Sequence, residues 1–257
     1  MRLPFTGLLA LLLSIAACAP KEDTPTTLKV ATAANVQFAM QALAEEFRQQ
    51  TGIKVEATIS SSGKLTAQIL EGAPYDLLIS ANMKYPEALL RDSAAVGNIK
   101  VYALGALVAW TMNGVPLQPK PDYMAGENIR KIAVANPKNA PYGVQALNYL
   151  QHYGMLEAVE PKLVYGESIA QTNQYILSRA AEVGITAKSV VLSPELKDKG
   201  RWVELPAGSY QPITQGAVIT AYGAKQHAEA SRQFFDFLSA PEAQAIFRRF
   251  GYTIPAE

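Results

Sequence analysis

The chain is arranged around Ile59-Ser-Ser-Ser-Gly-Lys-Leu-Thr-Ala-Gln-Ile-Leu70, where a β-prone run ends in three hydroxyl residues and a glycine. Apolar residues at helical spacing follow at once, so we expect Ser61 or Ser62 to cap a new helix with its side-chain oxygen. A helix start leaves several N–H donors unpaired and carries a partial positive charge, so it can bind an anion. Gly63 has no Cβ to keep a ligand from that backbone. An ordinary capped helix is the alternative.

Strands and helices alternate on both sides of this stretch. Three apolar strands are predicted, at Leu28–Ala34, Lys54–Ile59 and Leu77–Ile79. Asn35 is expected to cap the first helix, which carries apolar residues on one face and stops at Gly52. This order predicts a parallel sheet covered by helices on both faces, with helix N-termini gathered at the carboxyl ends of the strands.

A polar, proline-rich run at 113–122 follows an apolar segment and indicates a crossing into a second lobe. The β-prone pieces expected beyond it are residues 129–135, 163–165, 183–187, 190–192 and 202–205, and helices are expected after 143 and from Ser168. Residues 215–221 lead back to the first lobe, and two helices close the chain, one over 227–238 and one opening at Pro241. The predicted lobes are 28–103 plus 212–257 for lobe I, and 104–211 for lobe II.

The composition restricts the class of partner. The 257 residues are 49% hydrophobic and 18% charged, with a net charge of +1, which is typical of a globular protein. Binding to nucleic acid through bulk charge depends on neutralising many phosphates, so we expect no nucleic-acid partner. A bound anion must instead be held by local geometry.

The N-terminal residues have the pattern of an export signal. Arg2 precedes a leucine-rich apolar run that is too short to span a bilayer, and Ile15-Ala-Ala-Cys18 resembles a bacterial lipobox. We therefore expect residues 1–18 to be a lipoprotein-type signal ending at Cys18, the lipidated residue, with 19–27 as a tether to the membrane. Ordinary cleavage after Ala19 is the alternative. Cys18 is the one cysteine, so the mature body has no thiol chemistry.

Groupings that would indicate an enzyme or a metal site are missing from the sequence. The two histidines, His152 and His227, are expected to occupy solvated positions of predicted amphipathic helices. No Cys/His spacing suits a metal, and neither a nucleophile elbow nor a Walker-type phosphate loop is present. We expect no enzyme, no metal ligated by protein side chains and no cofactor.

A strand or loop that runs into a polar helix start occurs four times. The four starts are Ala34-Asn35, Ser61-Ser62-Gly63, Pro141-Tyr142-Gly143 and Glu167-Ser168-Ile169. Two lie in each predicted lobe, and together they offer N–H and O–H donors without a full positive charge. Such a set suits a fully ionised oxyanion, which only accepts hydrogen bonds, and it rejects an anion that still carries a proton.

The chain resembles the extracytoplasmic molybdate-binding components of bacterial molybdate ABC transporters. The matching pieces are Val30-Ala-Thr-Ala-Ala-Asn-Val36, Ser61-Ser-Gly-Lys-Leu65, Gly72-Ala-Pro-Tyr-Asp-Leu-Leu-Ile-Ser-Ala81, Ala133-Val-Ala-Asn-Pro137, Ala140-Pro-Tyr-Gly143 and Phe247-Arg-Arg-Phe-Gly-Tyr252. The resemblance implies an α/β, two-lobed, type II periplasmic-binding-protein fold, with mostly parallel sheets and two crossing strands as a hinge. It also implies a monomer outside the cytoplasm that captures molybdate or tungstate and delivers it to a membrane permease.

Carried over from the family, the oxyanion contacts are Asn35, Ser62, Tyr142 and Ile169. Asn35 is expected to use its side chain and backbone, Ser62 its hydroxyl and N–H, and the other two their backbone N–H groups, with the Tyr142 hydroxyl as a further donor. Related proteins with a serine at the first position have a ligand tyrosine where this chain has Ala187. The additional candidates are Ala34, Ser61, Gly63 and Ala187.

Several alternatives remain open from the sequence. Asn35 can be a plain cap and Tyr142 a surface aromatic. The ligand can be sulfate, phosphate or an organic acid instead, and the same fold can carry an enzyme. A lipoprotein without a transport role is a further alternative.

Overall fold

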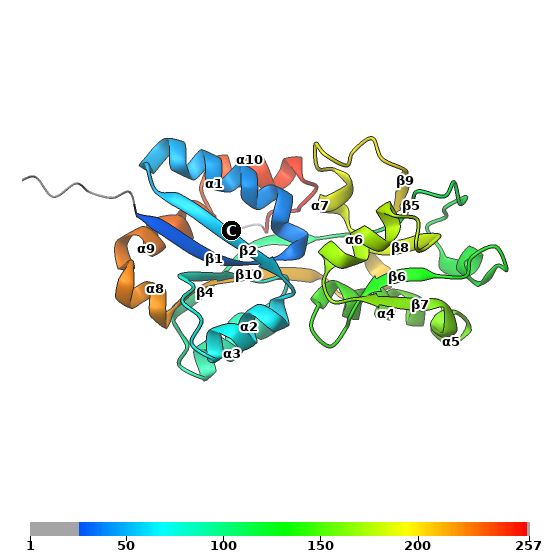
Figure 1. The fold of residues 1–257 in the computed structure, drawn as a ribbon, viewed down its shortest axis with the longest axis horizontal. Helices are drawn as coiled ribbons and strands as arrows, with labels where there is room; N and C mark the ends of the chain where they lie inside the picture. The colour runs from blue at the N-terminus through cyan, green and yellow to red at the C-terminus, as the bar shows by residue number, and fades with distance from the viewer. Residues whose placement is uncertain (1–25, 256–257) are drawn as a thin grey trace, which may run out of the picture.

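The computed structural model describes residues 26–255, and the predicted signal, Cys18 and most of the tether lie outside them. Two lobes lie side by side, each built on a five-stranded sheet (Figure 1). The first sheet has the order β2-β1-β3-β10-β4. Its strands are β1 (Thr27–Ala33), β2 (Lys54–Ser60), β3 (Leu77–Ile79), β4 (Ala95–Gly105) and β10 (Ile213–Thr220). Lobe I below means this sheet and its helices.

The second sheet repeats this arrangement in lobe II, with the order β7-β6-β8-β5-β9. Its strands are β5 (Leu107–Thr111), β6 (Ile132–Ala135), β7 (Leu163–Gly166), β8 (Val183–Ala187) and β9 (Arg201–Glu204). In each sheet three strands pair in parallel, as predicted, whereas the strand that arrives from the other lobe runs antiparallel to both neighbours. Each sheet is therefore mixed.

Helices cover both faces of the first sheet, with α1 and α10 on one face and α2 and α3 on the other (Figure 1). The helices of lobe I are α1 (Gln37–Thr51), α2 (Ser62–Leu70), α3 (Lys84–Arg91), α8 (Ala221–Gln226), α9 (Ala228–Phe237) and α10 (Pro241–Arg249). Leu77 and Ile79 pack into the core beneath α1, and Leu78 packs into the core beneath α2 and α3. A strand buried on both faces explains the continuous apolar run in its sequence.

Lobe II has shorter helices and several 3₁₀ turns. Its helices are α4 (Pro141–His152), α5 (Leu156–Val159), α6 (Ile169–Leu177) and α7 (Lys188–Val191). The 3₁₀ turns of the chain are η1 (Ala34–Val36) in lobe I and η2 (Pro121–Ala125), η3 (Glu160–Lys162) and η4 (Ala207–Ser209). Within residues 26–255, no helix is both long and apolar enough to cross a membrane.

The chain passes between the lobes at two places that lie next to each other. Ala106 alone separates β4 in the first sheet from β5 in the second, and the return runs from β9 to β10. The C-terminal segment supports the first crossing, because Leu104 and Thr253 exchange backbone hydrogen bonds of 2.7 and 3.0 Å. This arrangement brings Tyr252 to the boundary between the lobes.

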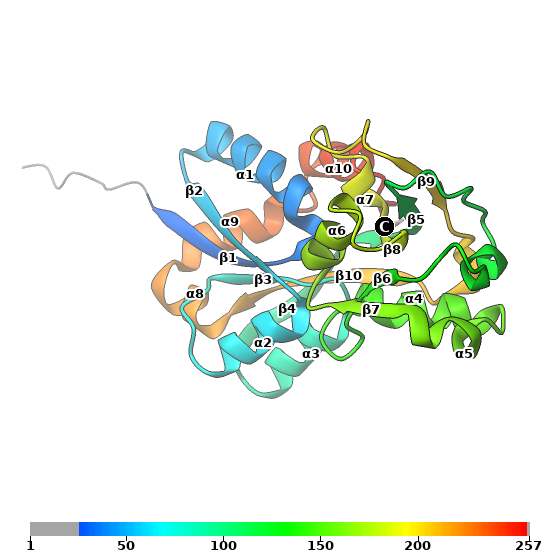
Figure 2. The ribbon, with the colours of Figure 1, turned by 45° about the vertical axis from the view of Figure 1, so that its right-hand side comes forward.

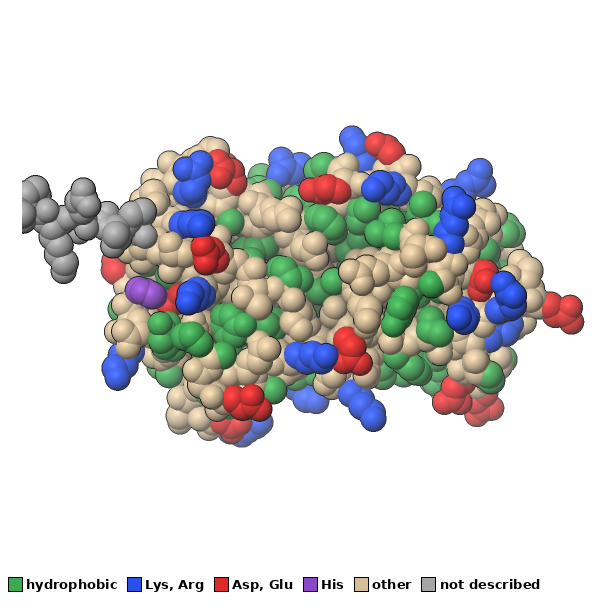
Figure 3. Space-filling view, viewed as in Figure 1, with side chains coloured by type: hydrophobic (Ala, Val, Ile, Leu, Met, Phe, Trp, Pro, Cys, Tyr) green, Lys and Arg blue, Asp and Glu red, His purple; other side chains and the backbone are tan. Residues whose placement is uncertain are grey.

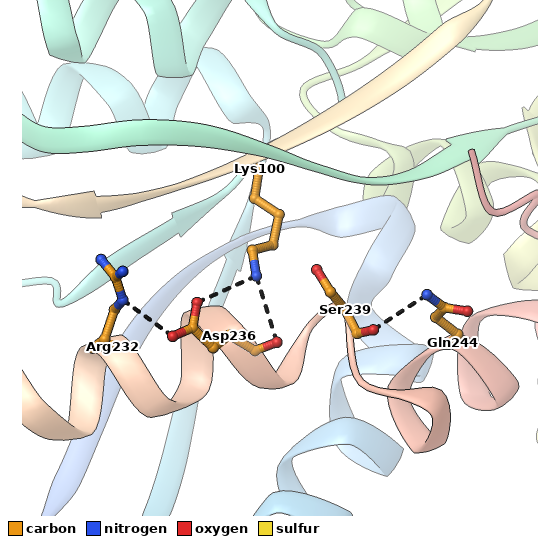
Figure 4. A network of polar contacts seen from close by, with 5 residues as sticks. All are labelled: Lys100, Arg232, Asp236, Ser239 and Gln244. Carbon is orange, nitrogen blue, oxygen red and sulfur yellow. Dashed lines mark hydrogen bonds and ion pairs between the residues drawn. The ribbon is translucent and has the colours of Figure 1, made fainter. Parts of the chain in front are cut away.

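Lys100 anchors the crossing strand β4 to helix α9 (Figure 4). Its ammonium lies 3.5 Å from both the carboxylate and the backbone carbonyl of Asp236, and 4.7 Å from the centre of the Phe235 ring. Arg232 donates to the other carboxylate oxygen of Asp236 at 3.1 Å. Burial lowers the pKa of Lys100, and the nearby Asp236 carboxylate opposes that shift.

Four local predictions were wrong. One is the side-chain cap on α2, because Ser61 makes no cap hydrogen bond and Ser62 Oγ accepts from the backbone N–H of Ala81 instead. The β-prone piece Val190–Leu192 is not a strand, because Val190 and Val191 belong to the short helix α7. Both valines are buried, and an apolar run this short signals burial without distinguishing a strand from a helix. Asn35 does not cap α1 but lies inside η1. His227 is not simply solvated, because its Nδ1 lies 2.8 Å from the buried carboxylate of Asp76.

Candidate functional site

A small cavity lies at the boundary between the lobes, where the first turns of several helices meet. Its lining from lobe I is Ala33, Ala34, Asn35, Ser61, Ser62 and Ala81, and its lining from lobe II is Ala140, Pro141, Tyr142 and Ile169. The space for the centre of a water-sized sphere is about 10 Å³. All four predicted contacts are therefore brought to one cavity, and each of them is at least 95% buried.

Helix starts supply backbone donors at three of these positions. Ser62 and Ile169 are the first residues of α2 and α6, and Tyr142 is the second residue of α4. The N–H groups of a first helical turn have no acceptor within their own helix. Figures 1 and 2 show α6 on the side of lobe II that faces lobe I. The three N–H groups come from both lobes, and the helix dipoles favour negative charge between them.

The Ser62 hydroxyl is held as a donor. The backbone N–H of Ala81 donates to Ser62 Oγ at 3.0 Å, so one lone pair of that oxygen is occupied and its proton is free for another acceptor. Ser61 occupies the N-cap position of α2, but its side chain makes no cap hydrogen bond. Ser61 Oγ is buried and has no hydrogen-bond partner within residues 26–255.

Asn35 is fixed by residues that are distant in sequence. Its backbone carbonyl accepts from Ser189 Oγ at 2.7 Å and from the Tyr252 hydroxyl at 2.9 Å. Its side-chain amide donates to Gln215 Oε1 at 2.7 Å and to the Tyr252 hydroxyl at 3.1 Å. Both amide protons are thus in use, so the donor that Asn35 can direct elsewhere is its backbone N–H.

Tyr142 extends from α4 in lobe II to the crossing strands. Its hydroxyl accepts from Gln215 Nε2 at 3.4 Å, and a Cβ on Gly105 would overlap it, so a glycine is needed at that position. Burial raises the pKa of Tyr142 well above its ordinary value. The phenol therefore keeps its proton at neutral pH and can donate a hydrogen bond.

The cavity lining carries no ionisable side chain other than this phenol. Charges of both signs are scattered over the face drawn in Figure 3, without a patch of one sign. One ion pair joins the lobes outside the cavity: Lys64 Nζ lies 2.6 Å from Glu167 Oε2, and both side chains are exposed. A negative ligand in the cavity would be held by dipoles and protons rather than by a formal positive charge.

The family of bacterial extracellular solute-binding proteins matches residues 28–253. This chain belongs to that family. The solute-binding protein is 34% identical over 223 residues to the molybdate-binding protein ModA of Rhodobacter capsulatus, a match that covers 86% of each chain. It is 33% identical over 226 residues to the ModA of Azotobacter vinelandii, covering 88% of this chain and 89% of the relative.

Solved structures of this kind have the same fold. The periplasmic molybdate-binding protein of Azotobacter vinelandii superposes with a TM-score of 0.84 at 35% identity, over 89% of this chain and all of the other. The sulfate-binding protein SubI of Mycobacterium tuberculosis superposes over 89% of this chain and 87% of the other, with a TM-score of 0.75 at 15% identity, which shows the fold alone. The predicted two-lobed periplasmic-binding-protein fold is confirmed.

The structure separates the four additional candidates into two pairs. Ala34 and Ser61 line the cavity, whereas Gly63 and Ala187 are not part of its wall. The Gly63 N–H donates to the backbone carbonyl of Asn139 at 2.9 Å. Ala187 ends β8, where it pairs with Leu107 and is fully buried.

Sequence reasoning missed the residues that support the contacts from behind. Gln215, Tyr252 and Ser189 were not singled out as site residues, although all three bond to Asn35 or Tyr142. Tyr252 does end one of the family motifs, which was a usable signal. No local sequence pattern marks Gln215 or Ser189 as a site residue. Within the described residues, no group of three His, Cys, Asp or Glu side chains could hold a metal ion.

Proposed function

We propose that this solute-binding protein captures molybdate or tungstate outside the cytoplasm and delivers it to the permease of an ABC transporter. One observation carries the proposal: neutral donors from both lobes line a single buried cavity that is free of charged side chains. Molybdate at neutral pH is a fully ionised tetrahedral oxyanion, so each of its oxygens accepts hydrogen bonds and none donates. The names of the relatives with 33–34% identity support the same ligand.

The proposed contacts are the backbone N–H groups of Asn35, Ser62, Tyr142 and Ile169, together with the hydroxyls of Ser62 and Tyr142. Ala34 and Ser61 are further candidates because they share the cavity wall. The Tyr142 hydroxyl takes the place of the ligand tyrosine that some related proteins have where this chain has Ala187. Hydrogen bonds to a charged acceptor are stronger than neutral ones, so a few donors are sufficient for tight binding.

The size of the cavity restricts the ligand. About 10 Å³ for the centre of a water-sized sphere is roughly the space that one water molecule needs, so a sugar phosphate or a larger organic acid does not fit in this state of the cavity. Sulfate has the same charge and is smaller than molybdate, so it would leave donors without an acceptor. The lining also lacks a carboxylate, imidazole or thiol that could act as a general base, which favours binding over catalysis.

The proposed mechanism is closure of the two lobes about the crossing strands. The proposed boundaries are 28–103 plus 212–257 for lobe I and 104–211 for lobe II, which divides the chain at the end of β4, just before the crossing at Ala106. An anion that contacts both lobes only when they are closed binds the closed state more tightly and shifts the population toward it. The permease then recognises the closed form. We propose that the protein acts as a monomer: one chain supplies every proposed contact, so the site does not require a second copy.

We further propose that the signal is cleaved just before Cys18, that Cys18 carries a lipid as the first residue of the mature protein, and that residues 19–27 tether the protein to a membrane. Labelled palmitate should be incorporated into the expressed full-length chain and not into the Cys18→Ala variant. Equal labelling of the two proteins would contradict the anchor without affecting the proposed ligand.

Calorimetric titration of the purified protein with molybdate, tungstate, sulfate and phosphate tests the ligand. Tight binding of the first two and weak binding of the others is expected. If sulfate or phosphate bound as tightly as molybdate, the proposed selectivity would be wrong. If no oxyanion bound, the proposed function would be wrong as a whole.

A further inference from the structure

Gln215 lies at the centre of a buried hydrogen-bond network that joins both lobes behind the cavity. It is on the returning strand β10, opposite Ala103 of β4, at a shift in the pairing register. Its Oε1 accepts from Asn35 Nδ2 at 2.7 Å, and its Nε2 faces the Tyr142 hydroxyl at 3.4 Å. The Tyr102 hydroxyl lies 2.9 Å from the same Oε1 and 3.0 Å from the backbone carbonyl of Ser80, and its single proton serves one of these two acceptors. Gln215 itself is fully buried.

The directions of the bonds that join Tyr252, Asn35 and Gln215 follow from the backbone carbonyl of Asn35, which can only accept. The Tyr252 hydroxyl gives its proton to the carbonyl of Asn35, so toward the Asn35 side chain it must accept. The Asn35 atom that faces Tyr252 is therefore the amide nitrogen. The same nitrogen faces Gln215, so the Gln215 atom opposite it is the oxygen.

The remaining atom of the Gln215 amide is then a donor, and it faces Tyr142. A hydroxyl that accepts from Gln215 keeps its own proton for a different acceptor. Tyr142 lies in the cavity wall and is 2% exposed, so its hydroxyl cannot donate that proton in a hydrogen bond to bulk water.

We infer that Gln215 is a positioning residue that makes Tyr142 a donor toward the bound anion, and that it thereby selects a fully ionised oxyanion over one that carries a proton. The inference rests on the proposed function and deepens it. A proton on the anion would face the proton of Tyr142, and one of the two would lose its acceptor. Gln215 acts through Tyr142 and does not itself touch the anion.

Gln215→Glu tests this assignment with little change in shape. A glutamate carboxylate only accepts, so it would take the Tyr142 proton and leave a lone pair of that hydroxyl facing the cavity. Molybdate would then lose a donor, and hydrogen phosphate would gain an acceptor for its proton. The added charge repels both anions, so the informative quantity is the ratio of the two affinities.

The experiment measures molybdate and phosphate affinities by calorimetry at about pH 8.5, where both anions are doubly negative and only phosphate keeps a proton. The ratio of molybdate to phosphate affinity should fall about tenfold or more in Gln215→Glu relative to the unmodified protein. Gln211→Glu is the matched control: this exposed glutamine lies outside the cavity wall, and its change should leave the ratio unaltered.

Two further variants keep the test decisive. Tyr142→Phe should lower the same ratio, because it removes a donor that molybdate uses and hydrogen phosphate cannot, and it does not depend on whether Gln215→Glu folds. The double variant should show no further change in ratio beyond Tyr142→Phe. An equal loss for both anions in Gln215→Glu, with tight molybdate binding by the unmodified protein, would overturn the inference alone. Absence of molybdate binding by the unmodified protein would overturn the proposed function.

Discussion

The backbone N–H of Gly63 donates to the backbone carbonyl of Asn139 at 2.9 Å. Gly63 is in the first turn of α2 in lobe I, and Asn139 is in the loop before α4 in lobe II. The two lobes are therefore joined by a main-chain hydrogen bond beside the cavity, in addition to the exposed pair of Lys64 and Glu167. Exposed ion pairs contribute little to stability, and salt in solution screens their attraction. The close approach at Gly63 is the more consequential contact for closure.

Gly63→Ala should weaken molybdate binding without destabilising the fold. A Cβ at this position would lie 2.8 Å from the Tyr85 hydroxyl, the end of a side chain that can turn away, and 3.0 Å from the Cα and the carbonyl oxygen of Asn139, which is closer than ordinary packing allows. The lobes or the Asn139 loop must then shift apart. Alanine favours the helix over glycine by about 1 kcal/mol, so the ligand-free protein should be as stable or more stable. We expect about a tenfold loss of affinity by calorimetry, with an unchanged or higher urea midpoint. An unaltered affinity would show that the contact does not control closure.

Ser62→Ala should remove one charge-assisted hydrogen bond. Such a bond contributes about 1.5–3 kcal/mol, so the molybdate affinity should fall roughly tenfold to a hundredfold. Ser178→Ala is the control, since this exposed serine ends α6 away from the cavity and its change should leave affinity unaltered. If the two variants bound molybdate equally well, Ser62 would not be a contact.

Asp76→Ala should destabilise the fold while the folded protein still binds molybdate. The fully buried carboxylate accepts from the Lys29 backbone N–H at 2.7 Å and lies 2.8 Å from His227 Nδ1. Its loss takes the acceptor from the Lys29 N–H and the partner from the half-buried His227 ring, at a cost of about 3 kcal/mol. Asp76 precedes β3, whereas the cavity lies beyond the other end of that strand, at Ala81.

Urea denaturation measures the loss for Asp76→Ala, with the exposed Asp92→Ala as a control expected to change little. Calorimetry on the folded variant, kept below its unfolding midpoint, measures the affinity. Equal urea midpoints for the two variants would contradict the structural role of Asp76.

The protein should lose stability in alkali through its buried tyrosines. Burial raises the pKa of Tyr252 from 10.0 to about 12, and burial raises the pKa values of Tyr102 and Tyr142 as well. Between about pH 10 and 12 the unfolded chain releases phenolic protons that the folded chain retains. The stabilisation that these tyrosines contribute is fully present below about pH 10. It is lost as the pH rises through their pKa values in the folded protein.

Urea midpoints measured at several pH values between about 9 and 11.5 check this prediction. The Tyr252→Phe variant should lose less stability over the same interval, because one of the raised groups is absent. Parallel profiles for the two proteins would show that Tyr252 does not contribute.

Much of the fold was predictable because its signals are local. The strand at Leu77–Ile79, the helix stop at Gly52 and the Ser168 cap each follow from a few neighbouring residues, and each is present in the structure. The failures came where the local signal was too weak or ambiguous. Val190 and Val191 are apolar because they are buried, and burial does not distinguish a short helix from a strand. Helix α8 was missed because its six residues carry too little periodicity to read.

The candidate site divides in the same way. The sequence by itself determined where helices begin with small or polar residues, since a cap or an open first turn depends on backbone groups three or four positions away. The family resemblance then selected Asn35, Ser62, Tyr142 and Ile169 from the four predicted starts. Only the tertiary structure decided that these four starts meet at one cavity and which of their donors are free. Asn35 is fixed by Gln215 and Tyr252, which are 180 and 217 residues away along the chain. No local sequence pattern encodes a hydrogen bond across that separation.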